Sequence, residues 1–249
     1  MADGKERLAL LKRLALTVAL ISLATPAWAG PPYVTDDPEP TDYQHFEIYF
    51  FGAGTHTRDG SGGAGGIDFN YGGLPDVQLT ATLPVEYDSP NGRPTIGGLG
   101  NIELAVKYKF LHQDDVGLDV AVFPRVFLPS ASSRVGDSHV SVLLPIWAEH
   151  DWDKWSVFGG GGCVFNSEKN FCLEGVALTR QFLPNLQLGV EVYHQGADSV
   201  GGEATTGLGF GAKYDLNETL HVIASMGPGL QHAAETNRYS WYAALLWTF

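Results

Sequence analysis

The chain ends on an alternating stretch, Tyr239-Ser-Trp-Tyr-Ala-Ala-Leu-Leu-Trp-Thr-Phe249. In an extended strand, successive side chains point to opposite faces, so every second residue shares a face. One face of this strand is apolar and carries aromatic rings at both of its ends. Its members are Tyr239, Trp241, Ala243, Leu245, Trp247 and Phe249. A chain terminus in water usually carries polar residues, so this face is expected to meet hydrocarbon or a packed core.

The first 29 residues have the pattern of a secretory signal peptide. Basic residues up to Arg13 precede the uncharged run 14–24, and Ala27-Trp-Ala29 then forms an A-x-A cleavage site. The alternative is a short transmembrane anchor, but the run is well short of the roughly 20 apolar residues that a spanning helix needs. We therefore expect residues 1–29 to be removed and the remaining chain to be exported.

The composition limits the class of protein. The chain has 28 acidic and 15 basic residues, for a net charge of −13, which argues against a nucleic-acid partner. It contains 31 glycines and no segment of sustained helical periodicity. Its longest apolar run after residue 29 is 142–148, too short for a helix that spans a membrane.

Twelve segments of about ten residues alternate between apolar and polar positions, and Gly, Pro, Asn or Asp residues bound each of them. The segments are 44–55, 63–71, 76–87, 98–110, 116–127, 138–149, 154–164, 171–182, 186–195, 204–214, 219–230 and 238–249. An even number of antiparallel strands places both termini on one side. The pattern predicts an all-β fold, a transmembrane antiparallel up-and-down β-barrel of about 12 strands, as one domain over residues 44–249.

The links between these segments alternate in length. The shorter links are 72–75, 111–115, 151–153, 183–185 and 215–218. The other links are mostly longer, and they are 56–62, 88–97, 128–137, 165–170, 196–203 and 231–237. Outer-membrane barrels are built with short periplasmic turns and long external loops, whereas a soluble sandwich has no reason to alternate them.

Charged side chains fall on one face of several predicted strands. A solvated sandwich face also alternates in this way. Here, however, isolated charges of both signs stand among small and uncharged polar residues, which suits the lumen of a barrel. An Arg or Lys facing lipid near the midplane would cost roughly 2–4 kcal/mol. We therefore expect Tyr239, Trp241, Trp247 and Phe249 to face lipid, with their rings at the two interfaces.

The charged residues that we predict to face the lumen are Glu47, Glu86, Glu103, Lys107, Asp119, Arg125, Glu174, Arg180, Glu191 and Lys213. They would line a permeation path and set selectivity, or they would be a ladder of salt bridges that only fills the lumen. Phe51, Phe123 and Tyr193 share the inward parity and are candidates for contact with a ligand. A twelve-stranded barrel favours a narrow or gated passage over a wide pore.

Four stretches carry a resemblance to a known family. They are Pro31-Pro-Tyr-Val-Thr-Asp-Asp-Pro-Glu-Pro40, Leu83-Pro-Val-Glu-Tyr87, residues 100–110 and Phe123-Pro-Arg-Val-Phe-Leu-Pro129. In these the chain resembles the outer-membrane family labelled putative MetA-pathway of phenol degradation. The resemblance implies an outer-membrane barrel of the transporter type, distantly akin to fatty-acid and aromatic-hydrocarbon uptake channels. The terminal Phe249 also resembles the C-terminal signal that the barrel assembly machinery reads.

Residues 30–43, which we call the leader, are rich in proline and acidic residues and cannot form a central strand. The leader would be a flexible periplasmic segment, or it would fold into the lumen as a plug. The plug hypothesis rests on its acidity, which would face Lys107, Arg125 and Arg180.

Cys163 and Cys172 flank the link 165–170, and in an oxidising compartment we expect them to form a disulfide across that hairpin. The alternative is two buried thiols. The eight histidines show no recognised metal-ligand spacing, and His150 with its neighbours is interpreted as a turn. His194 and Ser199 superficially suggest a hydrolase, but no G-x-S-x-G motif is present. We therefore predict no metal, no cofactor and no catalytic residues.

The sequence predicts a channel in the outer membrane of a Gram-negative bacterium, for passive uptake of small hydrophobic or aromatic solutes. Its expected partners are outer-membrane lipid, the barrel assembly machinery and a small-molecule solute. A second hypothesis is a non-transporting barrel that serves as an anchor, an adhesin or a surface-binding module through links 88–97 and 128–137. A third is an outer-membrane hydrolase with a reactive serine.

Overall fold

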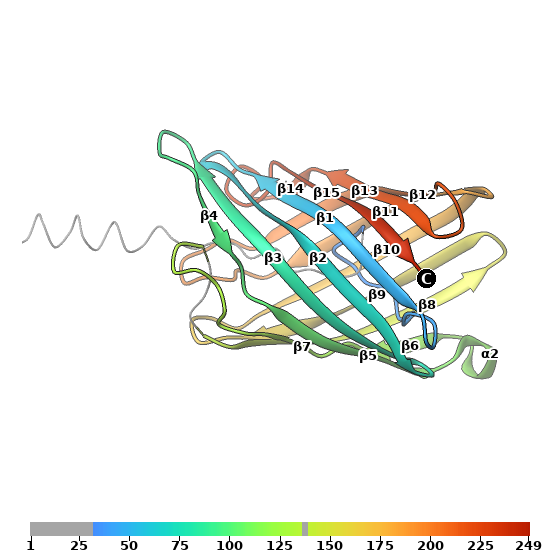
Figure 1. Cartoon of the computed structure of the whole chain (residues 1–249). Coiled ribbons are helices and arrows are strands. Elements are labelled where there is room, and N and C mark those ends of the chain that lie inside the picture. Colours follow the sequence, from blue (N-terminus) through green and yellow to red (C-terminus); the bar gives the residue numbers. More distant parts are fainter. Residues whose placement is uncertain (1–31, 136–138) are drawn as a thin grey trace, which may run out of the picture.

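The computed structural model describes residues 32–135 and 139–249, in which fifteen strand segments form one closed antiparallel sheet (Figure 1). The predicted signal peptide, residues 1–29, lies outside the described residues. The segments are β1 (Phe46–His56), β2 (Gly60–Leu74), β3 (Val77–Pro90), β4 (Ile96–Leu99), β5 (Glu103–Leu111), β6 (Asp119–Val122), β7 (Arg125–Phe127), β8 (Ser141–Trp152), β9 (Trp155–Phe165), β10 (Phe171–Leu183), β11 (Leu186–Gln195), β12 (Thr205–Asp215), β13 (Leu220–Gly227), β14 (Gly229–Gln231) and β15 (Tyr239–Thr248).

Three pairs of segments are the halves of interrupted strands. β4 and β5 both pair with β3, and β6 and β7 both pair with β5 and β8. β13 and β14 likewise both pair with β12. Pro124 and Pro228 stand at two of the three interruptions, where a residue without a backbone N–H cannot continue the ladder. The sheet therefore has twelve strands around the barrel, and the predicted fold class is confirmed.

The barrel closes between the first and last strands. β1 pairs antiparallel with β15 over a continuous register from Glu47 opposite Thr248 to His56 opposite Tyr239. Closure removes both free edges of the sheet, so every strand has a partner on each side.

The alternation of side chains follows the predicted pattern in most strands. In β3, Gln78, Thr80 and Thr82 are buried, whereas Leu79 and Leu83 are exposed on the outside. The last strand, β15, exposes the residues predicted to face lipid, and the alternate residues face inward. The exposed members are Tyr239, Trp241, Leu245, Trp247 and Phe249.

The connections differ in part from the predicted alternation. The strands β1 and β2 stay paired to His56 and Ser61, so the predicted longer link 56–62 is a tight turn over 57–59. On the opposite side, link 112–118 is longer than expected because it contains the one-turn helix α2 (Gln113–Val116). In the described residues, no helix is long and apolar enough to span a membrane.

Candidate functional site in the barrel lumen

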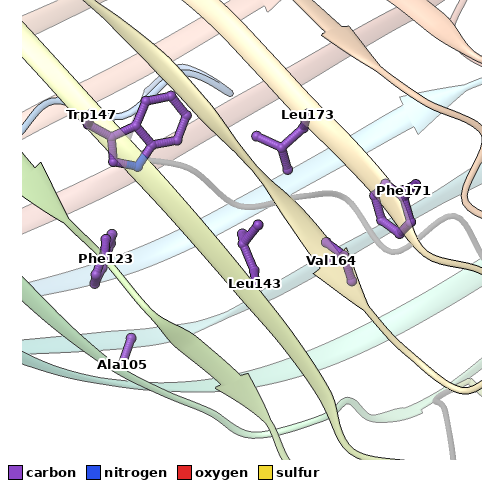
Figure 2. Packing of buried hydrophobic residues seen from close by; sticks show 7 residues of the cluster. All are labelled: Ala105, Phe123, Leu143, Trp147, Val164, Phe171 and Leu173. Atoms are coloured by element: carbon purple, nitrogen blue, oxygen red, sulfur yellow. The ribbon is translucent and has the colours of Figure 1, made fainter.

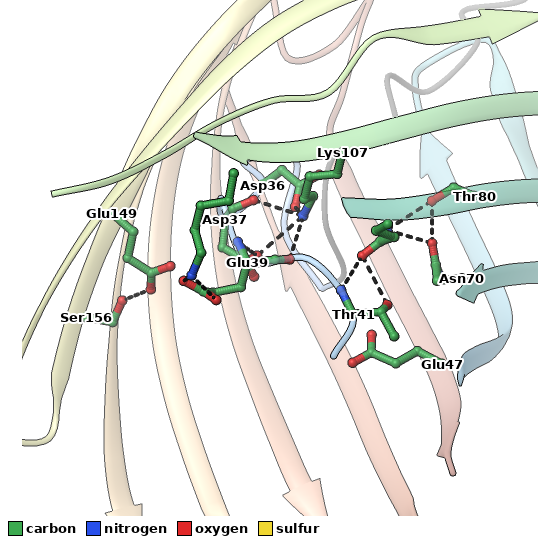
Figure 3. A network of polar contacts seen from close by, with 12 residues as sticks. Asp36, Asp37, Glu39, Thr41, Glu47, Asn70, Thr80, Lys107, Glu149 and Ser156 are labelled. Atoms are coloured by element: carbon green, nitrogen blue, oxygen red, sulfur yellow. Dashed lines mark hydrogen bonds and ion pairs between the residues drawn. The ribbon is translucent and has the colours of Figure 1, made fainter. Parts of the chain in front are cut away.

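The described part of the leader, residues 32–43, lies inside the barrel (Figure 3). Its prolines lack backbone donors, so it cannot join the sheet, and its polar groups find partners on the inner wall instead. Thr35 and Asp36 are each only 1% exposed. This is the position expected for a plug rather than for a segment outside the barrel.

Lys107 of β5 is the centre of the contacts between the leader and the wall. Its Nζ donates to Asp36 Oδ1 at 3.0 Å, to the Asp37 carbonyl at 2.9 Å and to the Glu39 carbonyl at 3.2 Å. Asp37 Oδ1 lies 3.4 Å away. Figure 3 shows these acceptors converging on the ammonium group from the leader. The side chains of Lys107 and Asp36 are only 5% and 2% exposed, so the pair is almost entirely desolvated.

A second lysine on the same strand binds the next acidic residue of the leader. Lys109 Nζ donates to both carboxylate oxygens of Glu39, at 2.7 and 2.8 Å. Asp119 of β6 lies 3.7 Å from the same nitrogen. Lys107 and Lys109 are two positions apart, so they share the inner face of β5 and form one cationic strip.

Arg125 of β7 is neutralised within the wall. Its guanidinium donates from Nε and Nη2 to the two carboxylate oxygens of Glu103, at 2.6 and 3.1 Å. The ring of Phe123 lies between the two cations, with its centroid 5.0 Å from Lys107 Nζ and 5.1 Å from Arg125 Cζ. These distances are within the range of cation–π attraction.

The start of the described leader binds the opposite wall. The carboxylate of Glu191 on β11 accepts the backbone N–H groups of Val34 and Thr35, both at 3.0 Å. Tyr33 lies over glycines on β11 and β12, and a Cβ added at Gly211 would be 2.6 Å from three atoms of its ring and hydroxyl. The hydroxyl of Ser225 donates to the Pro32 carbonyl.

The end of the leader is held by uncharged polar groups. Thr41 donates from its backbone N–H, at 2.8 Å, and from its hydroxyl, at 3.1 Å, to Gln78 Oε1. Gln78 Nε2 in turn donates to Asn70 Oδ1 at 2.8 Å, and the Thr80 hydroxyl donates to the same oxygen. The leader is therefore bound to the wall at three places along its length.

Burial affects the acidic groups of the leader. It raises the pKa of Asp36, and the neighbouring ammonium of Lys107 opposes that shift. Burial likewise raises the pKa of Glu39, and the hydrogen bond from Lys109 opposes it. In both cases the lysine is what favours the charged carboxylate.

Part of the inner wall is apolar (Figure 2). This cluster, which we call the apolar wall, crosses from β5 to β10. Its buried members are Ala105, Phe123, Leu143, Trp147, Val164, Phe171 and Leu173. Trp147 is only 1% exposed, and its Nε1 donor has no acceptor among the described residues. Phe123 belongs both to the apolar wall and to the cationic contacts with Lys107 and Arg125.

Comparison with known proteins agrees with this architecture. Residues 37–243 match the family described as "Putative MetA-pathway of phenol degradation". The chain belongs to this family. No curated protein matches the chain.

Two solved structures have a similar fold. The COG4313 outer membrane channel from Pseudomonas putida F1 is similar with a TM-score of 0.68 and 13% identity, over 85% of this chain and 99% of that one. The KdgM porin is similar with a TM-score of 0.56 and 11% identity, over 82% of this chain and 99% of that one. At these identities the likeness shows the shared barrel fold alone.

Most of the residues predicted to face the lumen of this MetA-pathway family member do so. The inward charged residues are Glu47, Glu86, Glu103, Lys107, Asp119, Arg125, Glu191 and Lys213. Phe51, Phe123 and Tyr193 are also buried within the barrel. The Tyr193 hydroxyl accepts a hydrogen bond from Asn237 Nδ2 at 2.6 Å. Contact of these three side chains with a ligand stays a prediction.

Glu174 and Arg180 were predicted to face inward, and that prediction is wrong. On β10 the buried positions are Phe171, Leu173, Ala177 and Thr179, so the even-numbered residues point outward. In the middle of β10 the inward residues Gly175, Ala177 and Thr179 are small, and the leader passes close to them, since a Cβ added at Gly175 would clash with Thr35 Oγ1. The expected contact between Arg180 and the leader is therefore absent.

Arg180 lies instead in a groove of about 770 Å³ on the outer surface of β9–β13 and β15. Its guanidinium carbon is 5.0 Å from the ring centroids of both Trp155 and Phe182. Arg180 and Glu174 each lie three positions from an end of β10, away from its middle. The cost of a lipid-facing charge falls towards the interfaces, to about 0–1 kcal/mol for Arg.

Several lumen residues were missed from the sequence. Glu149 of β8 is buried and accepts the Ser156 hydroxyl, and Asp68 of β2 accepts the Thr82 hydroxyl at 3.1 Å. The alternation of inward and outward positions along β8 and β2 predicts both as inward residues. Lys109 shares the parity of Lys107 but was left out of the predicted set. The partners of Asp36 had no local signal, because they lie about seventy positions away in the chain.

The structure also places the cysteines and histidines that the sequence analysis considered. Cys163 and Cys172 are opposite each other on β9 and β10 and form a disulfide. His194 Nδ1 is hydrogen-bonded to Thr206 Oγ1 at 2.9 Å, and His150 Nδ1 to the Gly117 carbonyl at 2.9 Å. No group of three or more potential metal ligands occurs within residues 32–135 and 139–249.

Proposed function

We propose that this chain is an outer-membrane channel for passive uptake of small apolar or aromatic solutes, in which the leader closes the lumen at rest. The observation that carries the proposal is the leader itself, which binds the inner wall through ion pairs and hydrogen bonds that span the lumen. Without the leader, the lumen of a twelve-stranded barrel would be intermediate in width. It would be wider than that of an eight-stranded barrel, which side chains fill, and narrower than that of the large porins.

The proposed solute class is supported by the apolar wall. Phe123 and Trp147 are aromatic groups on the inner surface, where a barrel that conducts only hydrated ions has no need of them. A solute in the lumen would contact the apolar wall next to the place where the leader binds Lys107, because Phe123 belongs to that wall and lies 5.0 Å from the ammonium group.

The membrane location and the assembly route are part of the same proposal. The outward rings of β15, together with Phe46 and Phe69 on the neighbouring strands, fit the aromatic belt of an outer-membrane barrel. We expect outer-membrane lipid to surround the strands, and the barrel assembly machinery to recognise the C-terminal strand that ends at Phe249.

A non-transporting barrel is the second candidate, because the leader fills the lumen in this structure. The purified full chain in planar bilayers separates the two functions. The channel proposal expects measurable conductance, with openings that become more frequent in the Glu191→Gln variant, which weakens the hold on Val34 and Thr35. Uptake of phenol into proteoliposomes should exceed that of a sugar of larger size. A barrel that neither conducts nor takes up phenol, in both the wild type and the variant, would contradict the channel.

A further inference from the structure

Every acceptor of the Lys107 ammonium group in the described residues belongs to the leader. The Asp36 carboxylate, the Asp37 carbonyl and carboxylate, and the Glu39 carbonyl all reach it from a segment about seventy positions earlier in the chain. The wall itself offers this buried cation no acceptor, although it provides Arg125 with both oxygens of Glu103. A buried ammonium that loses all of its acceptors is strongly destabilised. Departure of the leader therefore leaves this cation without a counter-ion on the wall and free to bind another anion.

The surroundings of Lys107 define what such an anion would look like. The ring of Phe123 lies 5.0 Å from the ammonium group, and the same ring packs in the apolar wall with Trp147 and Leu143. Figure 2 shows the Trp147 and Phe123 rings on neighbouring strands of this wall. The Nε1 of Trp147 is a buried donor with no acceptor in the described residues. A cation thus lies against an aromatic platform, and the apolar wall that holds this platform also carries a free donor. This combination fits a ligand with one anionic end and a flat apolar body.

Asp36 occupies the cationic end incompletely. Its Oδ1 accepts from Lys107, but its Oδ2 is buried and has no hydrogen-bond partner among the described residues. A buried carboxylate oxygen without a donor is costly, so the leader is an imperfect occupant that a better carboxylate can replace. When the leader leaves, Lys109, two positions along β5, also loses Glu39 and keeps only the carboxylate of Asp119 at 3.7 Å.

We propose that Lys107, Phe123 and Trp147 form a binding site for a small aromatic carboxylate, and that Asp36 of the leader occupies this site in the absence of the solute. The inference rests on the proposed channel function and narrows its solute class from aromatic molecules to aromatic anions. Binding of the carboxylate to Lys107 would displace Asp36, so recognition of the solute and release of the leader would be one event.

The neighbouring charges are consistent with this assignment. Glu103 is the acidic residue of the wall closest in sequence to Lys107 on the inner face of β5, and Arg125 neutralises it with two hydrogen bonds. Asp119 lies 3.7 Å from Lys109, so that lysine keeps one carboxylate when Glu39 leaves. Of these three cations, Lys107 is therefore the one that has no carboxylate partner on the wall once the leader has left.

Isothermal titration calorimetry of the full chain in detergent micelles at pH 7 tests the site, with benzoate as the probe. Benzamide has the same ring without the charge, and acetate has the charge without the ring. We expect benzoate to bind at least about ten-fold more tightly than either, because a charge-assisted hydrogen bond and a ring contact both contribute. Lys107→Gln should weaken benzoate binding at least about ten-fold, whereas Lys107→Arg should retain most of it.

Asp36→Asn is the decisive second variant, because it removes the charge of the internal competitor and leaves the wall intact. Benzoate should bind several-fold more tightly to it than to the wild type. Lys154→Gln, which removes an exposed lysine from the turn between β8 and β9, is the matched control and should bind as the wild type does. Heat-modifiable migration in electrophoresis confirms that each variant is a folded barrel.

Any of three results would overturn the site. The first is equal binding of benzoate and benzamide, and the second is unchanged benzoate binding in folded Lys107→Gln. The third is that benzoate binds neither the wild type nor Asp36→Asn. The conductance of the same preparations in planar bilayers reports on the channel function separately. A barrel that conducts but does not bind benzoate would therefore reject only this inference.

Discussion

Phe46 and Phe249 exchange two backbone hydrogen bonds, with N–O distances of 2.8 and 3.1 Å, and their rings stack with centroids 5.2 Å apart. The last residue of the chain therefore completes the seam between β1 and β15. Two further ring contacts extend the cluster, with centroid distances of 4.6 Å from Phe46 to Tyr71 and 4.7 Å from Phe249 to Trp247. The C-terminal residue is thus part of barrel closure as well as part of the outer aromatic surface.

Deletion of Phe249 should lower the yield of closed barrel. It removes two hydrogen bonds of the seam and stacking contacts worth about 0.5–1.5 kcal/mol each. The fraction of heat-modifiable protein after folding into micelles measures the effect. Phe249→Tyr keeps the ring and should fold as the wild type does, and a deletion variant that folds equally well would refute the role of the seam.

Breaking the buried pair of Glu103 and Arg125 should destabilise the barrel. The side chains are 4% and 6% exposed, so Glu103→Gln leaves a desolvated guanidinium with no full counter-charge. We expect a loss of about 3–5 kcal/mol in the free energy of unfolding, measured by urea titration in micelles. The double variant Glu103→Leu with Arg125→Met should recover much of this loss, and equal stability of the single variant and the wild type would contradict the prediction.

Gly211→Ala should displace the leader without touching its charges. The added Cβ would lie 2.6 Å from three atoms of Tyr33, and these are the nearest atoms that it would meet. We expect higher single-channel conductance than in the wild type. Combining the change with Tyr33→Ala should relieve the clash and show whether the overlap with Tyr33 is the cause. Unchanged conductance in folded Gly211→Ala would count against closure by the leader.

Removal of the disulfide should affect stability and spare the lumen. Cys172 is on the outward face of β10 and Cys163 is opposite it on β9, so neither side chain lines the passage. The crosslink closes a short loop with a sequence separation of 9, for which a contribution of at most about 2–3 kcal/mol is expected. Cys163→Ser with Cys172→Ser should therefore unfold at lower urea with unaltered conductance. A change in conductance would show that the hairpin contacts the passage.

The turn between β5 and β6 should respond to pH through His112. His112 Nε2 donates a hydrogen bond to Asp76 Oδ1 at 3.0 Å, and this bond raises the pKa of His112. The charged pair stabilises this turn below the usual pKa of histidine, and its contribution is lost as the pH rises through the raised value. Titration of His112 by nuclear magnetic resonance should show a lower pKa in Asp76→Asn, and an identical titration in that variant would disprove the pairing.

The number, order and closure of the strands could be predicted from sequence because the side-chain period of a strand is local. Leu79 and Leu83 alternate with Thr80 and Thr82 within a few residues, and the exposures follow that alternation. The same rule failed on β10, where small residues and outward charges weakened the contrast between the two faces. Glu174 and Arg180 were therefore assigned to the wrong side.

The sequence by itself determined which faces are apolar, how many strands form the barrel and which residues end it. Only the tertiary structure decided where the leader lies, because its partners are far away in the chain. Asp36 reaches Lys107 across 71 positions, and Thr35 reaches Glu191 across 156. Such contacts leave no periodic trace, since they depend on the curvature of the closed sheet, which brings β5 and β11 around one lumen. Local alternation sets each strand, whereas closure of the barrel sets the site.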